Sequence, residues 1–488
     1  MNRTGLAAVV GFLAFTLTAA QAQFTADFQT NIISGVTSNW VGYYFIGSNT
    51  FANVLLIENG GVFSNDYAYL GFEQSSSNNA AVITGSGSIW GNSEQLTVGY
   101  WGAGNQLVVS NGGKLVASYL LWIGGAITNS SNNSAVVDGV GSVLTTGRGL
   151  SIGIASGCNS LMVRHGGQVS SGAVQPDLGF TSLAKANNSV WVSDPGSKWQ
   201  DTSSGLILGG DTDGPGNRLV ISNQGQVVNL KAHVGFLSDS NSVRIVDGGV
   251  WQSDILSVGF RGSSNSVVVA GGTLLSTNLI VGVRTQSWDN VLELDSGSVI
   301  VTNATGDAVL EVRRGTLTIN GGTLQVDRFV MTNSCAQFVR TDGSLIYGTA
   351  ILDPNRDADG DSTPNGWEQS YGLDPLNAAD ADEDSDGDGQ NNLAEFLAGT
   401  DPTNSASAFR IIEVAPDGDD MVISWAAVGA KRYAVQTTIG DGGSYSNDFV
   451  DLNPAIVAPG TGETVVTVLH LNGATNAPAR FYRIRLVP

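Results

Sequence analysis

Hydrophobic and polar positions alternate in short runs that recur along most of the chain. Each copy begins with Asn, alternates apolar and polar residues, turns at glycine, alternates again and ends on an apolar-x-apolar-Gly segment. The runs NQLVVSNGGKLV at Asn105 and NSVRIVDGGVWQ at Asn241 show this unit plainly. Alternation over four to six residues is typical of half-buried strands, and no copy holds a 3.6-residue periodicity long enough for a helix.

The spacing of the opening asparagine predicts the architecture. It recurs every 24 to 29 residues, at Asn53, Asn79, Asn105, Asn133, Asn159, Asn188, Asn217, Asn241, Asn265 and Asn290. Strands that repeat at this period predict an all-β fold, a β-solenoid (β-helix) of about ten coils and roughly 50 Å in length. We expect the asparagines to stack as a ladder at a turn, and the turn glycines to adopt positive φ.

Four segments follow from the pattern. Residues 1–22 combine Arg3, an apolar run and the small-x-small site Ala20-Gln21-Ala22, as a secretory signal peptide does. Residues 23–352 form the solenoid, with 23–52 expected to cap one end and the degraded repeat after Thr302 to cap the other. Residues 353–407 form a separate acidic segment, and residues 408–488 form a small β module.

The last segment contains the strand-like runs MVISW, RYAVQ, ETVVTVLHL and RFYRIRLV between Gly, Asp and Pro turns. With Trp425 early and Tyr482 in the final run, it resembles a fibronectin type III-like sandwich. A sorting or attachment module is the alternative.

Composition and charge narrow the setting. Charged residues make up 13% of the chain, glycine counts 64, and the formal net charge is -21, which argues against nucleic acid and anionic membranes as partners. The N-terminal apolar run is too short for a convincing membrane span and no second one exists, so we expect a secreted, extracellular or cell-surface protein. The two cysteines, Cys158 and Cys335, are far apart in the repeat and predict neither a disulfide nor a zinc site.

Residues 353–407 carry metal chemistry. Their acidic positions fit a twelve-residue calcium loop twice, because alternate carboxylates on a turning loop converge on one centre and a final Glu closes it. The predicted Ca2+ ligands are Asp357, Asp359, Asp361, Thr363 (carbonyl), Asn365 and Glu368 in the first loop, and Asp384, Asp386, Asp388, Gln390 (carbonyl), Asn392 and Glu395 in the second. Ser362 stands where the second loop has Gly389, which predicts a more strained first site. An acidic, disordered linker is the alternative.

Two resemblances follow. The double loop, with a short helix ending at Gly372 and at Gly399, resembles thrombospondin type 3 and dockerin-like calcium repeats, although the cysteines of the animal thrombospondin repeats are missing. The solenoid copies resemble the repeats of bacterial autotransporter-like and PEP-CTERM-associated secreted proteins. That resemblance implies an extracellular β-helix, often of adhesive role.

Aromatic residues follow a glycine in six copies, at Tyr43, Phe72, Tyr100, Phe180, Phe236 and Phe260. Because Leu96, Val98 and Tyr100 alternate, the rings are expected to face inward as an internal stack rather than form a sugar-binding strip. Loop positions are then the better binding candidates, namely Tyr44, Trp101 and Trp288.

These observations predict a secreted or cell-surface, calcium-binding β-solenoid that acts as a non-catalytic adhesin or as a surface or matrix component. The expected partner is an extracellular polysaccharide or a cell-surface protein. A polysaccharide-active β-helix enzyme, lyase or glycoside hydrolase, is the alternative, with Asp211 and Asp213 as the only notable carboxylate pair. A purely structural extracellular rod is the second alternative. No catalytic residue is predicted.

Overall fold

The computed structural model describes residues 24–488 except 126, 173–180, 442–443, 446 and 476–478. The predicted signal peptide and Phe180 lie outside the described residues. The chain divides into two compact units, Met1–Ile351 and Leu352–Pro488. Among the described residues, no helix has the length and apolarity that a membrane span needs.

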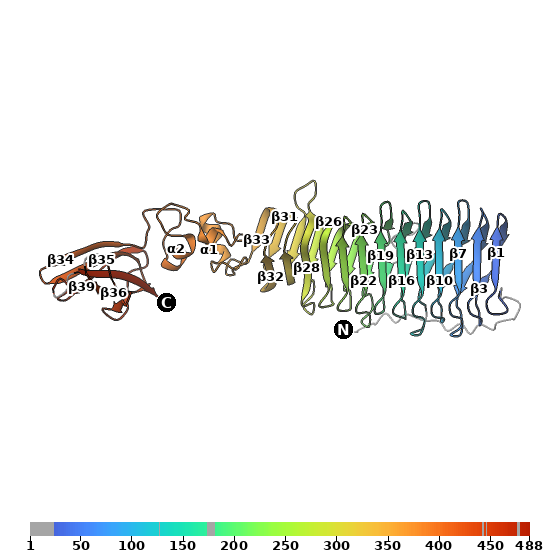
Figure 1. Cartoon of the computed structure of the whole chain (residues 1–488), viewed down its shortest axis with the longest axis horizontal. Coiled ribbons are helices and arrows are strands. Elements are labelled where there is room, and N and C mark those ends of the chain that lie inside the picture. Colours follow the sequence, from blue (N-terminus) through green and yellow to red (C-terminus); the bar gives the residue numbers. More distant parts are fainter. Residues whose placement is uncertain (1–23, 126, 173–180, 442–443, 446, 476–478) are drawn as a thin grey trace, which may run out of the picture. The chain divides into compact units, whose positions relative to one another are not determined.

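The first unit is a parallel β-solenoid, as predicted, in which each strand pairs with the corresponding strand of the next coil (Figure 1). It has about 13 coils rather than ten, which corresponds to a stack about 60 Å long at about 4.8 Å per coil. The segments expected to be caps supply the difference. Residues 30–46 form a complete coil, and the degraded repeat after Thr302 still forms parallel strands, because its alternation persists after the asparagine is lost.

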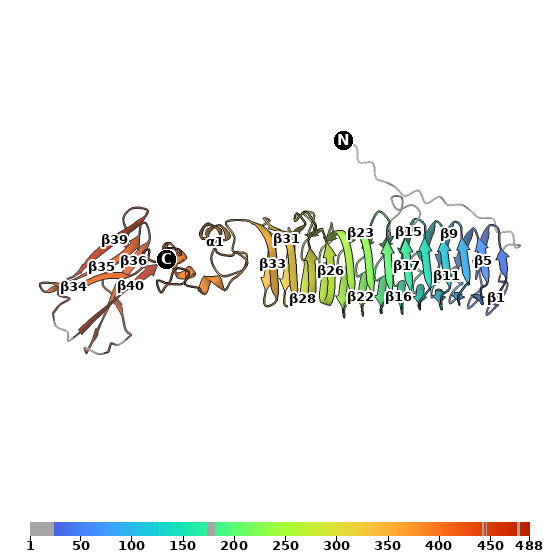
Figure 2. The ribbon, with the colours of Figure 1, turned by 90° about the horizontal axis from the view of Figure 1, so that it is seen from above.

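Three strands build each of the first seven coils, and Figure 2 shows the second strands β5, β11 and β17 in one row. The first strands are β1 (Thr30–Ser34), β4 (Val54–Glu58), β7 (Ala80–Thr84), β10 (Gln106–Ser110), β13 (Ser134–Asp138), β16 (Ser160–Arg164) and β19 (Ser189–Ser193). The second strands are β2 (Thr37–Asn39), β5 (Val62–Asn65), β8 (Ile89–Asn92), β11 (Lys114–Ala117), β14 (Val143–Thr146), β17 (Gln168–Ser171) and β20 (Lys198–Asp201). The third strands are β3 (Tyr43–Ile46), β6 (Tyr67–Leu70), β9 (Gln95–Val98), β12 (Leu120–Ile123), β15 (Gly149–Ile152), β18 (Thr181–Leu183) and β21 (Leu206–Leu208).

In the later coils neighbouring strands run together into longer ones. These strands are β22 (Arg218–Ser222), β23 (Gln226–Val234), β24 (Ser242–Val246), β25 (Val250–Val258), β26 (Ser266–Ser276), β27 (Asn278–Val281), β28 (Asn290–Val301), β29 (Val309–Val312), β30 (Arg314–Ile319), β31 (Thr323–Met331), β32 (Cys335–Arg340) and β33 (Ser344–Leu352). β23, for example, pairs with both β20 and β21 of the coil before it.

The predicted asparagine ladder is present and buried. All ten repeat asparagines are fully buried. The backbone N–H of each one except the last donates to the side-chain oxygen of the next, as from Asn105 to Asn133 at 2.9 Å and from Asn133 to Asn159 at 3.0 Å. Nine such bonds join Asn53 to Asn290 at 2.9 to 3.1 Å. Because a buried N–H without a partner is costly, the ladder fixes the register of successive coils.

The solenoid interior is filled with aliphatic side chains and three fully buried tryptophans. Each indole N–H donates to a polar side chain in the preceding coil: Trp90 to Asn65 at 2.7 Å, Trp199 to Ser171 at 3.1 Å and Trp251 to Asn229 at 2.7 Å. These bonds satisfy the one polar atom of a large apolar ring inside the core.

The aromatic rings lie on the outer face of the third strands, so the prediction of an internal stack was wrong. Phe45, Tyr69 and Phe72 form a cluster of their own, and Tyr69 alternates with the fully buried Ala68 and Leu70. The strand-ending glycines take positive φ (70° at Gly71), which breaks the alternation on which the prediction relied. The rings stack on one another, as Phe72 and Tyr100 do with centroids 5.2 Å apart and an interplanar angle of 5°.

The three loop candidates differ in exposure. Tyr44 is buried inside the first coil, and its burial raises the pKa of the phenol to about 12. Trp101 stacks on Tyr100. Trp288 is exposed, with the guanidinium of Arg314 over its ring.

In the second unit, the predicted C-terminal β module consists of two antiparallel sheets. One contains β34 (Ile411–Asp417), β35 (Asp420–Val428) and β39 (Glu463–His470), and the other β36 (Arg432–Gly440), β37 (Val450–Asp451), β38 (Ile456–Val457) and β40 (Ala479–Val487). Buried side chains from both sheets share one core around Trp425 and Tyr433, whose ring centroids are 6.0 Å apart.

Candidate metal centre

Residues 353–407 fold as two successive loops, each followed by one short helix. The helices are α1 (Asn365–Tyr371) and α2 (Asn392–Ala398), and a single 3-10 turn, η2 (Asp380–Asp382), lies between them. Both helices end at a glycine in the left-handed conformation, Gly372 with φ 76° and Gly399 with φ 82°, as such caps require. The first loop follows β33 and the second directly follows η2, so in this described segment no α-helix leads straight into either loop.

The two halves repeat with a shift of 27 residues in backbone detail as well as sequence. The Asn365 amide donates to the carbonyl of Asp353 at 2.8 Å, and that of Asn392 donates to the carbonyl of Asp380 at 2.6 Å, so each reaches back twelve residues. The Thr363 N–H donates to Asp361 and the Gln390 N–H to Asp388, at 2.7 and 2.8 Å.

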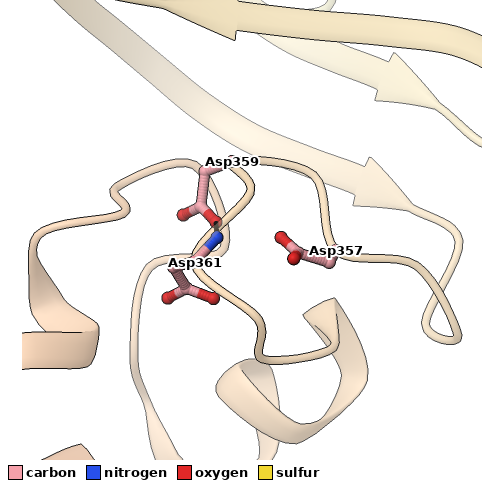
Figure 3. A group of neighbouring side chains, drawn as sticks. All are labelled: Asp357, Asp359 and Asp361. Carbon is pink, nitrogen blue, oxygen red and sulfur yellow. Dashed lines mark hydrogen bonds between the residues drawn. The ribbon is translucent and has the colours of Figure 1, made fainter. Parts of the chain in front are cut away.

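The predicted carboxylates converge within each loop. Figure 3 shows the side chain of Asp357 facing those of Asp359 and Asp361 across the first loop, and one oxygen of each lies within 4.8 Å of the others. The second loop brings Asp384, Asp386 and Asp388 together within the same limit. The geometry supplies the three carboxylate oxygens per site that Ca2+ accepts at about 2.3–2.6 Å.

Backbone N–H groups of each loop donate to these carboxylates and orient them, but several carboxylate oxygens that face the loop interior receive no hydrogen bond from the described residues. The first aspartate of each loop accepts from the loop backbone with both oxygens: Asp357 from Gly360 and Ser362, and Asp384 from Gly387 and Gly389. The other four aspartates use only Oδ1 in this way. Their buried Oδ2 atoms have no hydrogen-bond partner among the described residues, namely those of Asp359, Asp361, Asp386 and Asp388.

The closing glutamates give the decisive test of fit. Glu368 and Glu395 are 0% exposed, and none of their four carboxylate oxygens has a hydrogen-bond partner in the described part of the chain. A buried carboxylate without a donor is strongly disfavoured unless a cation sits beside it. The donor set therefore fits Ca2+, a hard cation that takes oxygen ligands.

Burial and mutual repulsion raise the pKa of several of these groups. Burial first, and then the neighbouring Asp359 and Asp361, raise the pKa of Glu368 to about 8. Burial raises the pKa of Asp359 to about 7, with Asp361 adding to it, and burial together with Asp386 raises that of Glu395 to about 7. Such shifts are expected when like charges are gathered without a compensating cation.

Asp380 joins the first site, although it lies outside the twelve-residue loop. Its carboxylate, with those of Asp361 and Glu368, forms a second group of oxygens within 4.8 Å. One of its oxygens accepts from the Asp374 N–H at 2.8 Å, and the other is buried without a partner among the described residues. The sequence signal that could have found it is the 27-residue repeat, which aligns Asp374-Pro375 with Asp401-Pro402 and Asp380 with Ser407.

The two predicted asparagine ligands, Asn365 and Asn392, differ in the hydrogen bonding of their side-chain oxygens. The side-chain oxygen of Asn365 accepts from the Ala358 N–H at 3.0 Å, so both ends of this amide bind backbone. The side-chain oxygen of Asn392 is buried without a partner among the described residues. Ser362 has φ 82° where Gly389 has φ 97°, which places the strain that the sequence predicted at that residue.

The two carboxylates considered for the enzyme alternative form ion pairs with a lysine. Asp211 and Asp213 both lie beside the ammonium of Lys185, at 3.0 and 3.5 Å. Hydrogen bonding to Lys185 lowers the pKa of Asp211 against the opposing effect of its burial. The pair is therefore part of a local ion-pair cluster.

Comparison with known proteins gives one structural match. No protein-family model matches the chain, and no curated protein matches it. A solved structure titled "TibC-catalyzed hyper-glycosylated TibA55-350 fragment" is similar at 16% identity, over 68% of this chain and 99% of that one, with a TM-score of 0.31.

Proposed function

We propose that this protein is a secreted or cell-surface β-solenoid that binds two Ca2+ ions in residues 353–407 and acts as a non-catalytic adhesin or surface component. The observation that carries the calcium proposal is the pair of fully buried glutamates, Glu368 and Glu395, whose oxygens have no donor among the described residues. The resemblance of this segment to thrombospondin type 3 and dockerin-like repeats supports the same ion.

The first ion would be held by Asp357, Asp359, Asp361, Glu368 and Asp380 with the predicted Thr363 carbonyl, and the second by Asp384, Asp386, Asp388, Asn392 and Glu395 with the predicted Gln390 carbonyl. Asn365 is left out because both ends of its side-chain amide bind backbone. When bound, Ca2+ neutralises carboxylates that otherwise repel one another. The chain itself aims them through the loop N–H groups and the two amide clamps. The expected role is a calcium-stiffened joint.

The second loop is also tied to the C-terminal β module. The ammonium of Lys431 donates to the carbonyl of Leu397 at 2.7 Å, and the Ser407 hydroxyl donates to the Glu463 carboxylate on β39. Ordering of α2 by the ion therefore supports the position of the β module next to it.

Calorimetric titration of the chelated protein with Ca2+ tests this proposal, with two ions bound as the expected result. Glu368→Gln and Glu395→Gln should each abolish or strongly weaken one site, whereas Glu383→Gln, an exposed residue between the loops, should leave both. Chelation should increase the hydrodynamic radius and proteolytic cleavage between Asp353 and Pro402. Absence of Ca2+ binding by the unmodified protein contradicts the proposal.

The adhesive role is supported by the predicted signal peptide and by the resemblance of the repeats to secreted solenoids. Its test is incubation of the mature protein with a panel of plant and algal polysaccharides, recording both protein depletion and chain length. Depletion without shortening supports a binding protein. Shortening of any glycan favours the enzyme alternative, and neither effect favours the structural rod.

A further inference from the structure

A hollow of about 430 Å3 lies on the outer face of the solenoid, across the third strands β18, β21 and β23. Its floor is Ser182 and Ile207, and its walls include Gly205, Lys231, His233 and Phe236. The volume lies within the range of pockets that bind small ligands, about 300–1,000 Å3. All lining residues are far along the sequence from the calcium loops.

The hollow arises from a change of side-chain size along one column of the sheet. Ser182, Ile207 and His233 are successive register partners that face outward. In the first two coils this column holds the bulky Phe45 and Tyr69. Gly205 and Gly210 lie near Ile207 and have no side chains, which leaves a recess. The larger side chains of the next coil, Lys231, His233 and Phe236, border this recess.

Two rings form the closing wall. His233 is 7% exposed, its Nδ1 lies 2.6 Å from the Ser257 hydroxyl, and its ring packs on Phe236 and Phe260 with centroids 5.1 and 5.0 Å away. Burial, and then the nearby Lys231 charge, lower the pKa of His233 to about 4, so the imidazole is neutral at pH 7. A neutral imidazole offers one donor and one acceptor.

Phe236 lines the hollow with a partly buried ring. It stacks on Phe260, with centroids 5.1 Å apart and an interplanar angle of 17°, and Arg284 covers the Phe260 ring further along. Gly210 also lines the hollow and has no side chain to fill it. Apolar faces of sugar rings pack on aromatic faces of this kind.

Lys231 gives the hollow its charge. It is exposed, and the described residues that line the hollow include no acidic residue. In the part of the chain that the structure describes, Lys231 forms no ion pair, whereas Lys185 is paired with Asp211. A local ammonium without an acidic partner can pair with an anionic group of a ligand.

We propose that this hollow binds a carboxylate-bearing sugar residue of an acidic polysaccharide. Lys231 pairs with the carboxylate, His233 hydrogen-bonds a hydroxyl, and the ring of Phe236 packs against the sugar ring. The inference deepens the proposed function by naming the ligand class of the rod, and it rests on that function for its extracellular setting.

Calorimetric titration with an oligogalacturonate tests the proposal, with the carboxyl-reduced neutral oligosaccharide as the matched ligand. Lys231→Met should weaken binding of the acidic probe by about tenfold or more, and the exposed Lys114→Met, on a second strand, should not. Gly210→Leu should fill the hollow with an uncharged side chain. The backbone can accept that side chain, because the nearest atom to an added Cβ is 3.4 Å away. Thermal melting would confirm that each variant is folded.

Selective binding of the acidic probe, lost in both hollow variants and kept in Lys114→Met, supports the site. No binding by the unmodified protein, equal binding of the neutral probe, or binding unaffected by either hollow variant overturns it. The titration is repeated in chelator, where the hollow should still bind. Failure of the calcium sites would thus leave this result intact, and cleavage of the probe would overturn only the non-catalytic role.

Discussion

Gly99 lies so close to Asn133 that a Cβ added to the glycine would be 2.2 Å from the carboxamide carbon of the asparagine. The same relationship recurs between Gly259 and Asn290, also at 2.2 Å, and between Gly47 and Asn79, at 2.5 Å to the nearest carboxamide atom. The strand-ending glycine of the repeat therefore serves two purposes. It allows positive φ and it leaves room for the ladder.

Gly99→Ala should destabilise the solenoid by about 3 kcal/mol, because left-handed strain adds to displacement of Asn133. Gly60→Ala is the matched control, since Gly60 has the same φ of 77° but no atom within 4 Å of an added Cβ. It should cost only about 1 kcal/mol in free energy of unfolding, measured by urea denaturation. Equal losses would show that the close approach is relaxed at little cost.

Asn159→Ala should cost about 1–3 kcal/mol, because it leaves the buried N–H of Asn133 without its acceptor. The control is Asn129→Ala, at an exposed loop position in the coil that precedes it, which should change the free energy of unfolding by less than about 0.5 kcal/mol. Similar values for the two variants would contradict a stabilising ladder.

Asp380→Asn should weaken Ca2+ binding at the first site by about tenfold or more and leave the second unchanged, because it removes charge from the carboxylate group that includes Glu368. Asp382→Asn, exposed on the same 3-10 turn, is its control. Calorimetry on the Glu395→Gln background isolates the first site. Unchanged affinity in Asp380→Asn would exclude this residue as a ligand.

Ser362→Gly should strengthen the first site, because glycine adopts φ 82° without the strain of a Cβ, worth about 1 kcal/mol. Ser385→Gly, in the second loop at a position without positive φ, should bring no gain. A loss of Ca2+ affinity in Ser362→Gly would mean that the serine side chain contributes to the site.

Calcium affinity should rise with pH between about 6 and 8. The pKa of Glu368 is raised to about 8, and those of Asp359 and Glu395 to about 7. In the ion-free state protonation of these groups therefore favours the folded segment, and that contribution is lost as the pH rises through these values. Ca2+ needs the deprotonated carboxylates, so its uptake should release protons.

Calorimetry in buffers of different ionisation heat measures that release, and Glu368→Gln should release fewer protons than the unmodified protein. We expect the affinity at pH 8 to exceed that at pH 6 by on the order of tenfold or more. A pH-independent affinity would contradict the raised pKa values as the cause.

The sequence was informative wherever one local rule acted alone. Period and alternation predicted the solenoid and the ladder at Asn133, and the offsets of the acidic residues predicted the twelve-residue loops. The number of coils was underestimated since the first coil and the coils after Asn290 lack the marker asparagine but keep the alternation. The ring of Tyr100 was misplaced because a single positive φ at Gly99 reverses the face that follows.

Two features depend on contacts that no single repeat copy contains. Asp380 reaches the first site from outside its loop. The hollow beside His233 exists only because residues from three coils differ in size at one column. The spacing and composition of a single copy do not show which side chains of adjacent copies come together.

All nine ladder bonds run in one sense, from the N–H of each coil to the side chain of the coil that follows it in sequence. A chain that emerges from a ribosome or an export channel N-terminus first thus presents each coil before its acceptor exists. The turn at Asn133, for example, stays open until Asn159 has emerged. During such emergence each coil can complete its ladder bond only after the next coil has emerged, so we expect folding of the solenoid to follow emergence with a delay of one coil.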